Sequence, residues 1–325
     1  MKQAVAIITL ALALAAPCRT QTPSKPPEVK TEAGAASPAV DAGKLFEDVR
    51  VLSADEMEGR GAGTPGGARA RSYITGRFGQ TGLKPFFGAS FEQPVELAAR
   101  GGGKAGAGAN VVGVVRGKKN PERFVVVTAH YDHLGVRNGQ IYNGADDNAS
   151  GVATLLALAA HFSRQPPDNS FIFAALDNEE GGGAGAKTLV KTLLEAKRDV
   201  ALNVNLDMVS HSARGELYAA GTYHYPSLKP LLEKVAARAP VKLLLGHDRP
   251  EPKADDWTTQ SDHGAFHKEK IPFVYFGVED HEDYHKPSDD FGTITQDFFA
   301  RAAETILEAL KTFDENLSTV ERPKR

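Results

Sequence analysis

Cysteine is almost absent from this chain: its 325 residues contain one, Cys18. A single thiol allows neither a disulfide within the chain nor a thiolate metal site. Any metal ion must therefore be held by histidine, aspartate and glutamate side chains. Aromatic residues are also scarce, at 8%, whereas glycine occurs 32 times, which indicates many tight turns and loops.

An excess of charge of either sign is missing as well. The chain has 38 lysines and arginines against 41 aspartates and glutamates, a net charge of -3. No basic tract contains interleaved aromatic residues, so nothing indicates nucleic acid as a partner. With 41% hydrophobic and 24% charged residues, the composition is that of a globular protein long enough for one large core.

The N-terminus has the pattern of an export signal. Residues 1–18, "MKQAVAIITLALALAAPC", contain one lysine, an apolar run and then small residues, and the run is too short for a membrane span. Cleavage after "ALA", which ends at Ala15, would suit ordinary signal peptidase. The alternative is a lipoprotein signal, because "LAAPC" resembles a lipoprotein box. We expect an exported protein, periplasmic or extracellular, whose one membrane contact would be a lipid on Cys18.

The rest of the chain predicts one domain. Residues 19–42 are rich in Pro, Ala, Ser and Thr, which is typical of a flexible linker. We expect a monomeric domain over 43–317 and a polar tail over 318–325. Continuous Val/Ile/Phe strands alternate with helices, which predicts an α/β fold whose central sheet is mixed, mostly parallel and covered by helices on both faces. The expected strands are 90–97, 109–117, 123–130, 170–176, 200–209 and 271–278, and the expected helices are 43–61, 63–85, 147–165, 185–197, 225–239 and 295–313.

Polar side chains follow the predicted strands. In open α/β sheets, ligand sites lie beyond the carboxyl ends of the strands. Histidines and carboxylates from five strand ends or loops should therefore meet at one edge: His130, Asp132, Asp146, Asp147, Glu179, Glu180, Asp207 and His285. Like charges this close raise one another's pKa and destabilise the fold unless cations lie among them. Histidine and carboxylate ligands without cysteine favour zinc over manganese or cobalt.

Each of these residues alone has an ordinary structural explanation. Two adjacent glutamates are typical of a solvated turn, a histidine after a strand is usually structural, and an aspartate before a helix is usually an N-cap. It is their convergence on one edge that favours a metal site.

Five motifs, in this order and spacing, resemble the co-catalytic di-zinc exopeptidases: "AHYDHLG", "NGADDNASG", "NEEGG", "NLDM" and "YHKPSDD". That family includes bacterial secreted aminopeptidases, plasma-type glutamate carboxypeptidases and glutaminyl cyclases. The resemblance also takes in "EMEGRGAGTPGGARA" and "SDHGAFHKEKIPFVYF", and so spans residues 45–315. It implies the phosphorylase/hydrolase-like fold of zinc exopeptidases and two zinc ions per chain.

The resemblance also implies the ligands. The Asp-Asn-x-Ser-Gly run aligns Asp147, rather than its neighbour, with the carboxylate that bridges the two zinc ions. His130 and Asp207 would complete one metal position. Glu180 and His285 would complete the other.

The adjacent glutamates would have different roles, since neighbouring residues at a strand end point to opposite sides. Glu180 would bind metal. Glu179 would take a proton from the attacking water and hand it to the leaving amine. Asp132 and Asp262 would lie behind the ligands, Asp132 by accepting the second ring N–H of His130.

The chain departs from the family pattern in two respects. "GGGAGAK" replaces the common Gly-Leu-x-Gly-Ser run after the glutamates, which would widen the wall next to the base. Seven histidines match no ligand position and are interpreted as structural or surface residues: His133, His161, His211, His224, His247, His267 and His281. For His263, a structural role and a role behind the ligands stay open.

The leading functional interpretation is an exported zinc aminopeptidase acting on the N-termini of peptides. A glutaminyl cyclase or carboxypeptidase of the same fold is the alternative, and a non-catalytic exported binding protein is a third. The cyclases of this family use a single zinc, so two complete ligand sets argue against that activity. An intact Glu179 argues against a binding protein, and no G-x-S-x-G nucleophile motif is present.

Overall fold

A computed structural model of the protein describes residues 39–98, 106–251 and 254–323. The expected export signal, 1–18, and all but the last residues of the expected linker, 19–42, lie outside the described residues. No helix in the described part of the chain combines the length and the apolar character needed to span a membrane.

Nine of the described strands form one sheet: β1 (Lys84–Pro85), β2 (Glu92–Leu97), β3 (Gly106–Val115), β4 (Asn120–His130), β7 (Asn169–Leu176), β8 (Asp199–Leu206), β9 (Glu216–Ala220), β10 (Lys242–Leu245) and β11 (Phe273–Gly277). Their order is β1-β3-β7-β4-β8-β11-β9-β10, with β2 paired to β3. The central strands β7, β4, β8 and β11 are parallel neighbours, and antiparallel pairs flank them. The predicted α/β domain with a mixed, mostly parallel sheet is confirmed.

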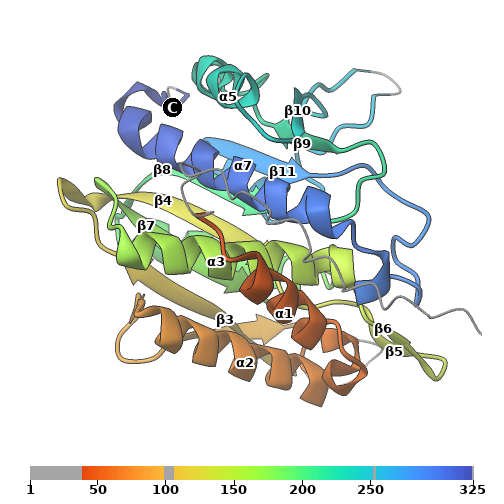
Figure 1. The fold of residues 1–325 in the computed structure, drawn as a ribbon. Helices are drawn as coiled ribbons and strands as arrows, with labels where there is room; N and C mark the ends of the chain where they lie inside the picture. Colours follow the sequence, from red (N-terminus) through yellow and green to blue (C-terminus); the bar gives the residue numbers. More distant parts are fainter. Residues whose placement is uncertain (1–38, 99–105, 252–253, 324–325) are drawn as a thin grey trace, which may run out of the picture. The chain divides into compact units, whose positions relative to one another are not determined.

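Helices cover both faces of the sheet: α1 (Ala42–Leu52), α2 (Pro65–Thr81), α3 (Gly151–Arg164), α4 (Ala184–Glu195), α5 (Lys229–Ala236), α6 (His263–Lys268) and α7 (Gln296–Asn316). Successive strand residues point to opposite faces. Val125 and Val127 belong to a buried cluster with residues of α1, α2, α3, α5 and α7, whereas Phe124 and Val126 belong to a second cluster with residues of α4 and α6. In Figure 1, α1, α2, α3 and α7 lie in front of the sheet.

Several elements differ from those expected. The helix expected over 43–61 ends at Leu52, because the backbone of Ala54 is extended. In the following η1 (Asp55–Arg60), Glu58 and Gly59 have φ of 46° and 62°, which prevents the helix from continuing. The helix expected from residue 147 begins at Gly151. The short elements β9, β10 and α6 were not expected, because segments of four to six residues carry too little apolar periodicity to be recognised. A hairpin, β5 (Gly135–Arg137) and β6 (Gln140–Tyr142), was also missed.

The register of the parallel strands positions the site. His130 pairs with Leu176 across β4 and β7, and Thr128 pairs with Asn205 across β4 and β8. These strands therefore end at the same edge of the sheet. The loops that follow them lie side by side there.

Candidate active site

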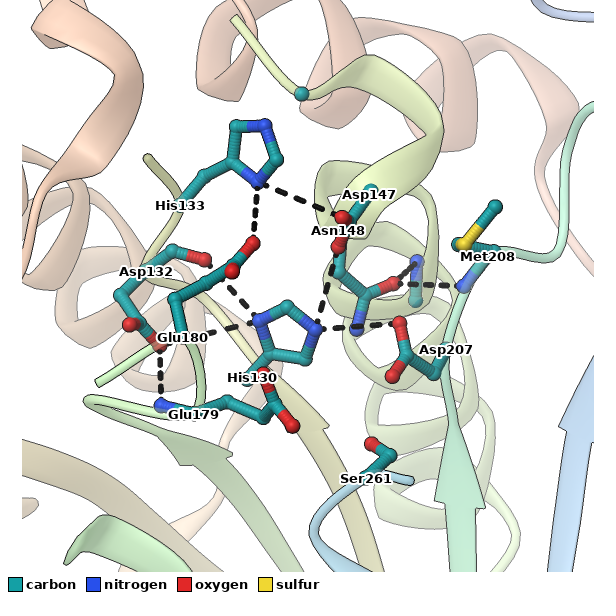
Figure 2. Close-up of polar contacts among 12 residues, drawn as sticks. His130, Asp132, His133, Asp147, Asn148, Glu179, Glu180, Asp207, Met208 and Ser261 are labelled. Atoms are coloured by element: carbon teal, nitrogen blue, oxygen red, sulfur yellow. Dashed lines mark hydrogen bonds and ion pairs between the residues drawn. The ribbon is translucent and has the colours of Figure 1, made fainter. Parts of the chain in front are cut away.

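His130, at the end of β4, faces two carboxylates. Its Nε2 lies 3.1 Å from Asp207 Oδ1 and 3.4 Å from Asp147 Oδ1 (Figure 2). Its Nδ1 lies 3.1 Å from the carbonyl oxygen of Asp132 and 3.8 Å from the carboxylate of that residue. The expectation that the Asp132 carboxylate accepts this ring N–H is therefore corrected, because the carbonyl is the nearer acceptor. Donation from Nδ1 leaves Nε2 free to bind a cation.

A second group of side chains meets the other oxygen of Asp147. His285 Nε2 lies 3.1 Å from Asp147 Oδ2 and 3.3 Å from Glu180 Oε1. His133 Nδ1 lies 2.9 Å from the same Glu180 oxygen and 3.6 Å from Asp147 Oδ2. The structure thus brings the five expected ligands together, with Asp147 between the two groups. It also places His133, which was interpreted from the sequence as a structural or surface residue, beside the same two carboxylates.

The turn that presents Asp147 is tied to the end of β8. Asn148 Oδ1 accepts hydrogen bonds from the backbone N–H groups of Gly151 and Met208, and its Nδ2 donates to the Leu206 carbonyl. A Cβ on Gly151 would lie 2.3 Å from Asn148 Oδ1, so only glycine allows this approach. These contacts hold the Asp147 turn against the strand that ends beside Asp207.

Asp146 and Asp147 point to different surroundings. Asp146 is fully buried, and its Oδ1 accepts hydrogen bonds of 2.7 Å from both the N–H and the hydroxyl of Ser210. Its Oδ2 lies 3.1 Å from His281 Nε2. Asp289 accepts the backbone N–H groups of both aspartates, at 2.9 and 3.0 Å. The structure therefore gives Asp146 a supporting role, and it adds Asp289, a residue within "YHKPSDD" that sequence reasoning did not single out.

A buried arginine lies behind the carboxylates. Arg60 is fully buried, and its guanidinium donates to the carbonyl oxygens of five residues: Leu52, Tyr131, Asn143, Gly144 and Asp147. Burial lowers its pKa to about 10, against the opposing effect of nearby carboxylates, so it stays charged at neutral pH. Sequence reasoning missed Arg60, although it stands within the "EMEGRGAG" segment of the resemblance. It joins the loop after β4 to the turn that carries Asp147.

The adjacent glutamates lie in a turn and not on a strand. β7 ends at Leu176, and Asn178 has a φ of 66°, so the strand alternation expected to separate them does not apply. The backbone N–H of Glu179 donates to Asp132 Oδ1 at 2.9 Å. In Figure 2 their side chains leave in different directions, Glu180 toward the second group of ligands and Glu179 toward the side of Ser261.

The surroundings of Glu179 and Glu180 give the two carboxyl groups different pKa values. Burial, reinforced by the charges of Asp262 and Asp207, raises the pKa of Glu179 to about 9. For Glu180 the contacts with His133 and His285 outweigh burial and hold its pKa well below its usual range. Cations bound nearby would lower the pKa of Glu179 toward neutrality. Glu180 is thus suited to bind a cation, and Glu179 to accept and release a proton.

Asp262 and His263 have different environments. Burial raises the pKa of Asp262 to about 7, and neither of its carboxyl oxygens has a hydrogen-bond partner among the described residues. Asp262 acts on the site through its charge, which raises the pKa of Glu179. His263 lies 2.8 Å from the Trp257 carbonyl through Nε2, and burial lowers its pKa to about 3. His263 therefore donates this N–H as a neutral ring, which is a structural role.

The donor set fits metal ions. A tetrahedral zinc ion with ligands at about 2.0–2.1 Å separates neighbouring ligand atoms by about 3.3 Å, close to the distances from His130 and His285 to the carboxylates. Ligand atoms within 4.8 Å of one another form two sets that share Asp147: His130, Asp147 and Asp207, and His133, Asp147 and Glu180. Buried Glu180 Oε1 has no hydrogen-bond partner among the described residues, as expected of an atom that binds a cation.

Without metal, the protein should lose stability as pH rises. The folded-state pKa values of Glu179, about 9, and of Asp262 and Asp289, about 7, lie above those of carboxyls in an unfolded chain. The fold therefore holds protons that the unfolded chain has lost. This contribution is fully present below about pH 4 and is lost as pH rises through about 7 and then 9. We expect the Tm of chelated protein to fall from pH 5 to pH 9. An unchanged or rising Tm would contradict it, and zinc-loaded protein, whose cations favour the ionised carboxylates, should depend less on pH.

Comparisons with known proteins identify the family to which this chain is similar. The model of "Peptidase family M28" matches residues 110–310. Aminopeptidase YwaD of Bacillus subtilis is 29% identical over 217 residues, which cover 62% of this chain and 44% of that protein. A "Probable zinc metalloprotease" of Pyrenophora tritici-repentis is 36% identical over 108 residues, 31% of this chain and 24% of that protein. The chain thus spans less than half the length of these relatives.

Solved structures share the fold. An aminopeptidase from Aneurinibacillus sp. strain AM-1 superposes with a TM-score of 0.67 at 18% identity, covering 88% of this chain and 95% of that one. A glutaminyl cyclase from Fimbriiglobus ruber gives 0.69 at 20% identity, with 86% and 99% covered. At these identities the likeness concerns the fold alone. The match to the family model, however, extends over more than half of the sequence, and the chain belongs to peptidase family M28.

Proposed function

We propose that the protein is an exported, monomeric zinc aminopeptidase that removes residues from the N-termini of peptides. The observation that carries the proposal is the charge of the pocket around the candidate ligands, here called the metal pocket, which has a volume of about 370 Å³. Among the described residues its lining includes carboxylates and no lysine or arginine. Carboxylates match a free ammonium group, whereas a free C-terminal carboxylate needs a cationic partner. The pocket therefore favours the amino end of a peptide.

The lining of the metal pocket also includes apolar and aromatic side chains: Met208, Trp257, Tyr275, Val278 and Tyr284. Contacts with such side chains favour an apolar side chain on the terminal residue of the substrate.

Asp280 is the carboxylate in this lining that we place neither among the metal ligands nor in proton transfer, and we propose that it binds the substrate's ammonium group. Asp280→Asn should then raise KM by about 10-fold with a smaller change in kcat, because a partly exposed charge-assisted hydrogen bond is lost in both the bound state and the transition state. Steady-state kinetics on a short peptide checks this. Asp283→Asn, on the same loop but outside the lining, is the matched control. An unchanged KM in Asp280→Asn would remove Asp280 from substrate binding.

The proposed chemistry divides the residues into ligands and a base. Zinc ions held by His130, Asp147, Glu180, Asp207 and His285 would lower the pKa of water and polarise the scissile carbonyl. Glu179 takes a proton from the attacking water and transfers it to the leaving amine. Asp132 holds the backbone of Glu179 through the hydrogen bond of 2.9 Å, which keeps the base in place.

A second cleft supports peptides as substrates. It has a volume of about 850 Å³, runs between α4 and α6 over Val190 and Leu194, and shares Glu179 and Gly182 with the metal pocket. Because Glu179 protonates the leaving amine, the part of the substrate peptide that follows the scissile bond lies on the side of this cleft. Gly182, Gly183 and Ala186 of "GGGAGAK" line this cleft.

The decisive experiment identifies the end that shortens. Zinc-loaded protein is incubated with free, N-acetylated and C-amidated forms of one peptide, and the products are weighed by mass spectrometry. We expect residues to leave the free and amidated peptides from the N-terminus, and the acetylated form to persist. Shortening from the C-terminus would indicate a carboxypeptidase. Loss of ammonia from an N-terminal glutamine without shortening would indicate a glutaminyl cyclase, and unchanged peptides would leave a binding protein.

The proposal that the protein is exported rests on residues 1–18, and cell fractionation tests it. We expect the parent protein outside the cytoplasm. If Cys18 is acylated, the parent will be in the membrane fraction and Cys18→Ser in the soluble exported fraction, with unchanged catalysis. A soluble exported parent would instead indicate cleavage near Ala15, and a cytoplasmic parent would overturn export.

A further inference from the structure

We infer that His133 is a fourth protein ligand of the metal position formed by Asp147, Glu180 and His285. The inference rests on the proposed zinc binding. It makes the two positions unequal. One is closed by four side chains, and the other, formed by His130, Asp147 and Asp207, keeps a place open.

The ring of His133 lies where a ligand would lie. Its side chain is completely buried, with Nδ1 2.9 Å from Glu180 Oε1 and 3.6 Å from Asp147 Oδ2. Figure 2 shows the ring directed at these two carboxylates. The same two oxygens are approached by His285 Nε2, at 3.3 and 3.1 Å. Two imidazole nitrogens thus converge on one pair of carboxylate oxygens.

A hydrogen bond between His133 and Glu180 does not account for this arrangement. Neither ring nitrogen of His133 has a hydrogen-bond partner among the described residues, and neither does Glu180 Oε1, although the two atoms are close. The contact therefore lacks the angles of a hydrogen bond. Buried polar atoms without partners are rare in folded proteins. A cation between His133 Nδ1 and Glu180 Oε1 would give both of these atoms a partner.

The backbone around His133 holds the ring in this position. The backbone N–H of His133 donates to the Arg60 carbonyl at 3.4 Å, and the residue forms a parallel bridge with Gly61. The ring packs directly on Gly144, where a Cβ would lie 2.5 Å from His133 Cδ2 and 2.0 Å from the Asp147 carbonyl. A ring fixed in advance loses little freedom when it binds a metal ion.

The inequality separates the tasks of the two positions. Zinc sites with four protein ligands are typically structural, whereas sites with three keep a place for water or substrate. The open position is the one at His130, and in Figure 2 Glu179 lies beside His130, on the side away from His133. The base therefore stands beside the open position. The position with His133 should bind zinc more tightly and release it last.

The test measures zinc affinity and does not depend on activity. Chelated parent protein, His133→Gln and the control His161→Gln, which removes a buried histidine from α3, are titrated with zinc in competition with a chromophoric chelator. We expect two unequal binding steps in the parent and the control. In His133→Gln the tighter step should weaken by at least about 10–100-fold, the range seen when support of a metal site is lost.

Further measurements separate ligation from folding. In His133→Ala, added imidazole should restore the tighter zinc step, which would not follow if the side chain only filled space. The visible spectrum of the first cobalt(II) ion bound should change in His133→Gln and not in His161→Gln. If His133→Gln and His133→Ala both unfold, NMR of the ring nitrogens in the parent protein decides the question. One equivalent of zinc should then shift the resonance of His133 Nδ1.

Two outcomes distinguish this inference from the proposed function. If the parent binds two zinc ions and His133→Gln binds both with parental affinity, His133 is no ligand and the inference is overturned, while the proposed function stands. If the parent binds no zinc, the proposed function fails, and the inference fails with it.

Discussion

Replacing Glu179 with glutamine should lower turnover by about 10²–10⁴-fold, the usual contribution of a general base, while zinc content stays near that of the parent. Glutamine keeps the shape of the side chain but lacks the basic oxygen that accepts the proton of water. Substrate affinity should change less than turnover, because the lost interaction belongs mainly to the transition state. Single-turnover kinetics and elemental analysis on the same preparation measure both quantities.

Glu180→Gln is the matched control, since the two residues are neighbours in one turn. A neutral amide is a poor zinc ligand, so metal content and activity should fall together in this variant. Measuring both zinc content and rate in the two variants therefore distinguishes a general base from a metal ligand. Retention of most activity in Glu179→Gln would show that Glu179 is no base.

Asp147→Asn should remove both zinc ions at once, because each oxygen of Asp147 faces a different group of ligands. A bound metal ion supplies several kcal/mol of transition-state stabilisation, so activity should fall by about 10³-fold or more. Zinc stoichiometry after dialysis checks the first expectation, and steady-state rates check the second. Loss of only one zinc ion would mean that Asp147 does not bridge.

Asp146→Asn is the neighbouring control, and the structure changes what to expect of it. Its carboxylate accepts two hydrogen bonds from Ser210 and faces His281 inside the fold. The amide should therefore lower the Tm and leave zinc stoichiometry closer to the parent's than Asp147→Asn does. If Asp146→Asn lost more zinc than Asp147→Asn, the assignment of the bridging carboxylate would be off by one residue.

The fold and the ligand loops could be predicted because both depend on the continuous apolar strands β4, β7 and β8. Parallel strands of this kind must end at one edge of a sheet, so the polar residues that follow each strand were expected to meet there. His130, Glu180 and Asp207 do meet around Asp147 in the structure.

What could not be predicted depends on contacts between distant parts of the chain. The orientation of His133 is set by its bridge to Gly61 and by the space left at Gly144, and neither follows from the spacing of residues around it. The separation of Glu179 from Glu180 was expected for the wrong reason. It arises from a turn stabilised by Asp132, which accepts the backbone N–H of Glu179, and not from the pleat of a strand.

Arg60 bears on how small a metal-binding fragment of this protein can be. The family model begins at residue 110, so a fragment cut at that boundary would keep every proposed ligand. It would lose the guanidinium that donates to the Tyr131 and Asp147 carbonyls and whose charge lies behind the carboxylates. The loop after β4 and the turn that carries Asp147 would then lose the donor that they share, and the carboxylates would lose a buried positive charge. We therefore expect the unit able to bind metal to be larger than the unit by which the family is recognised.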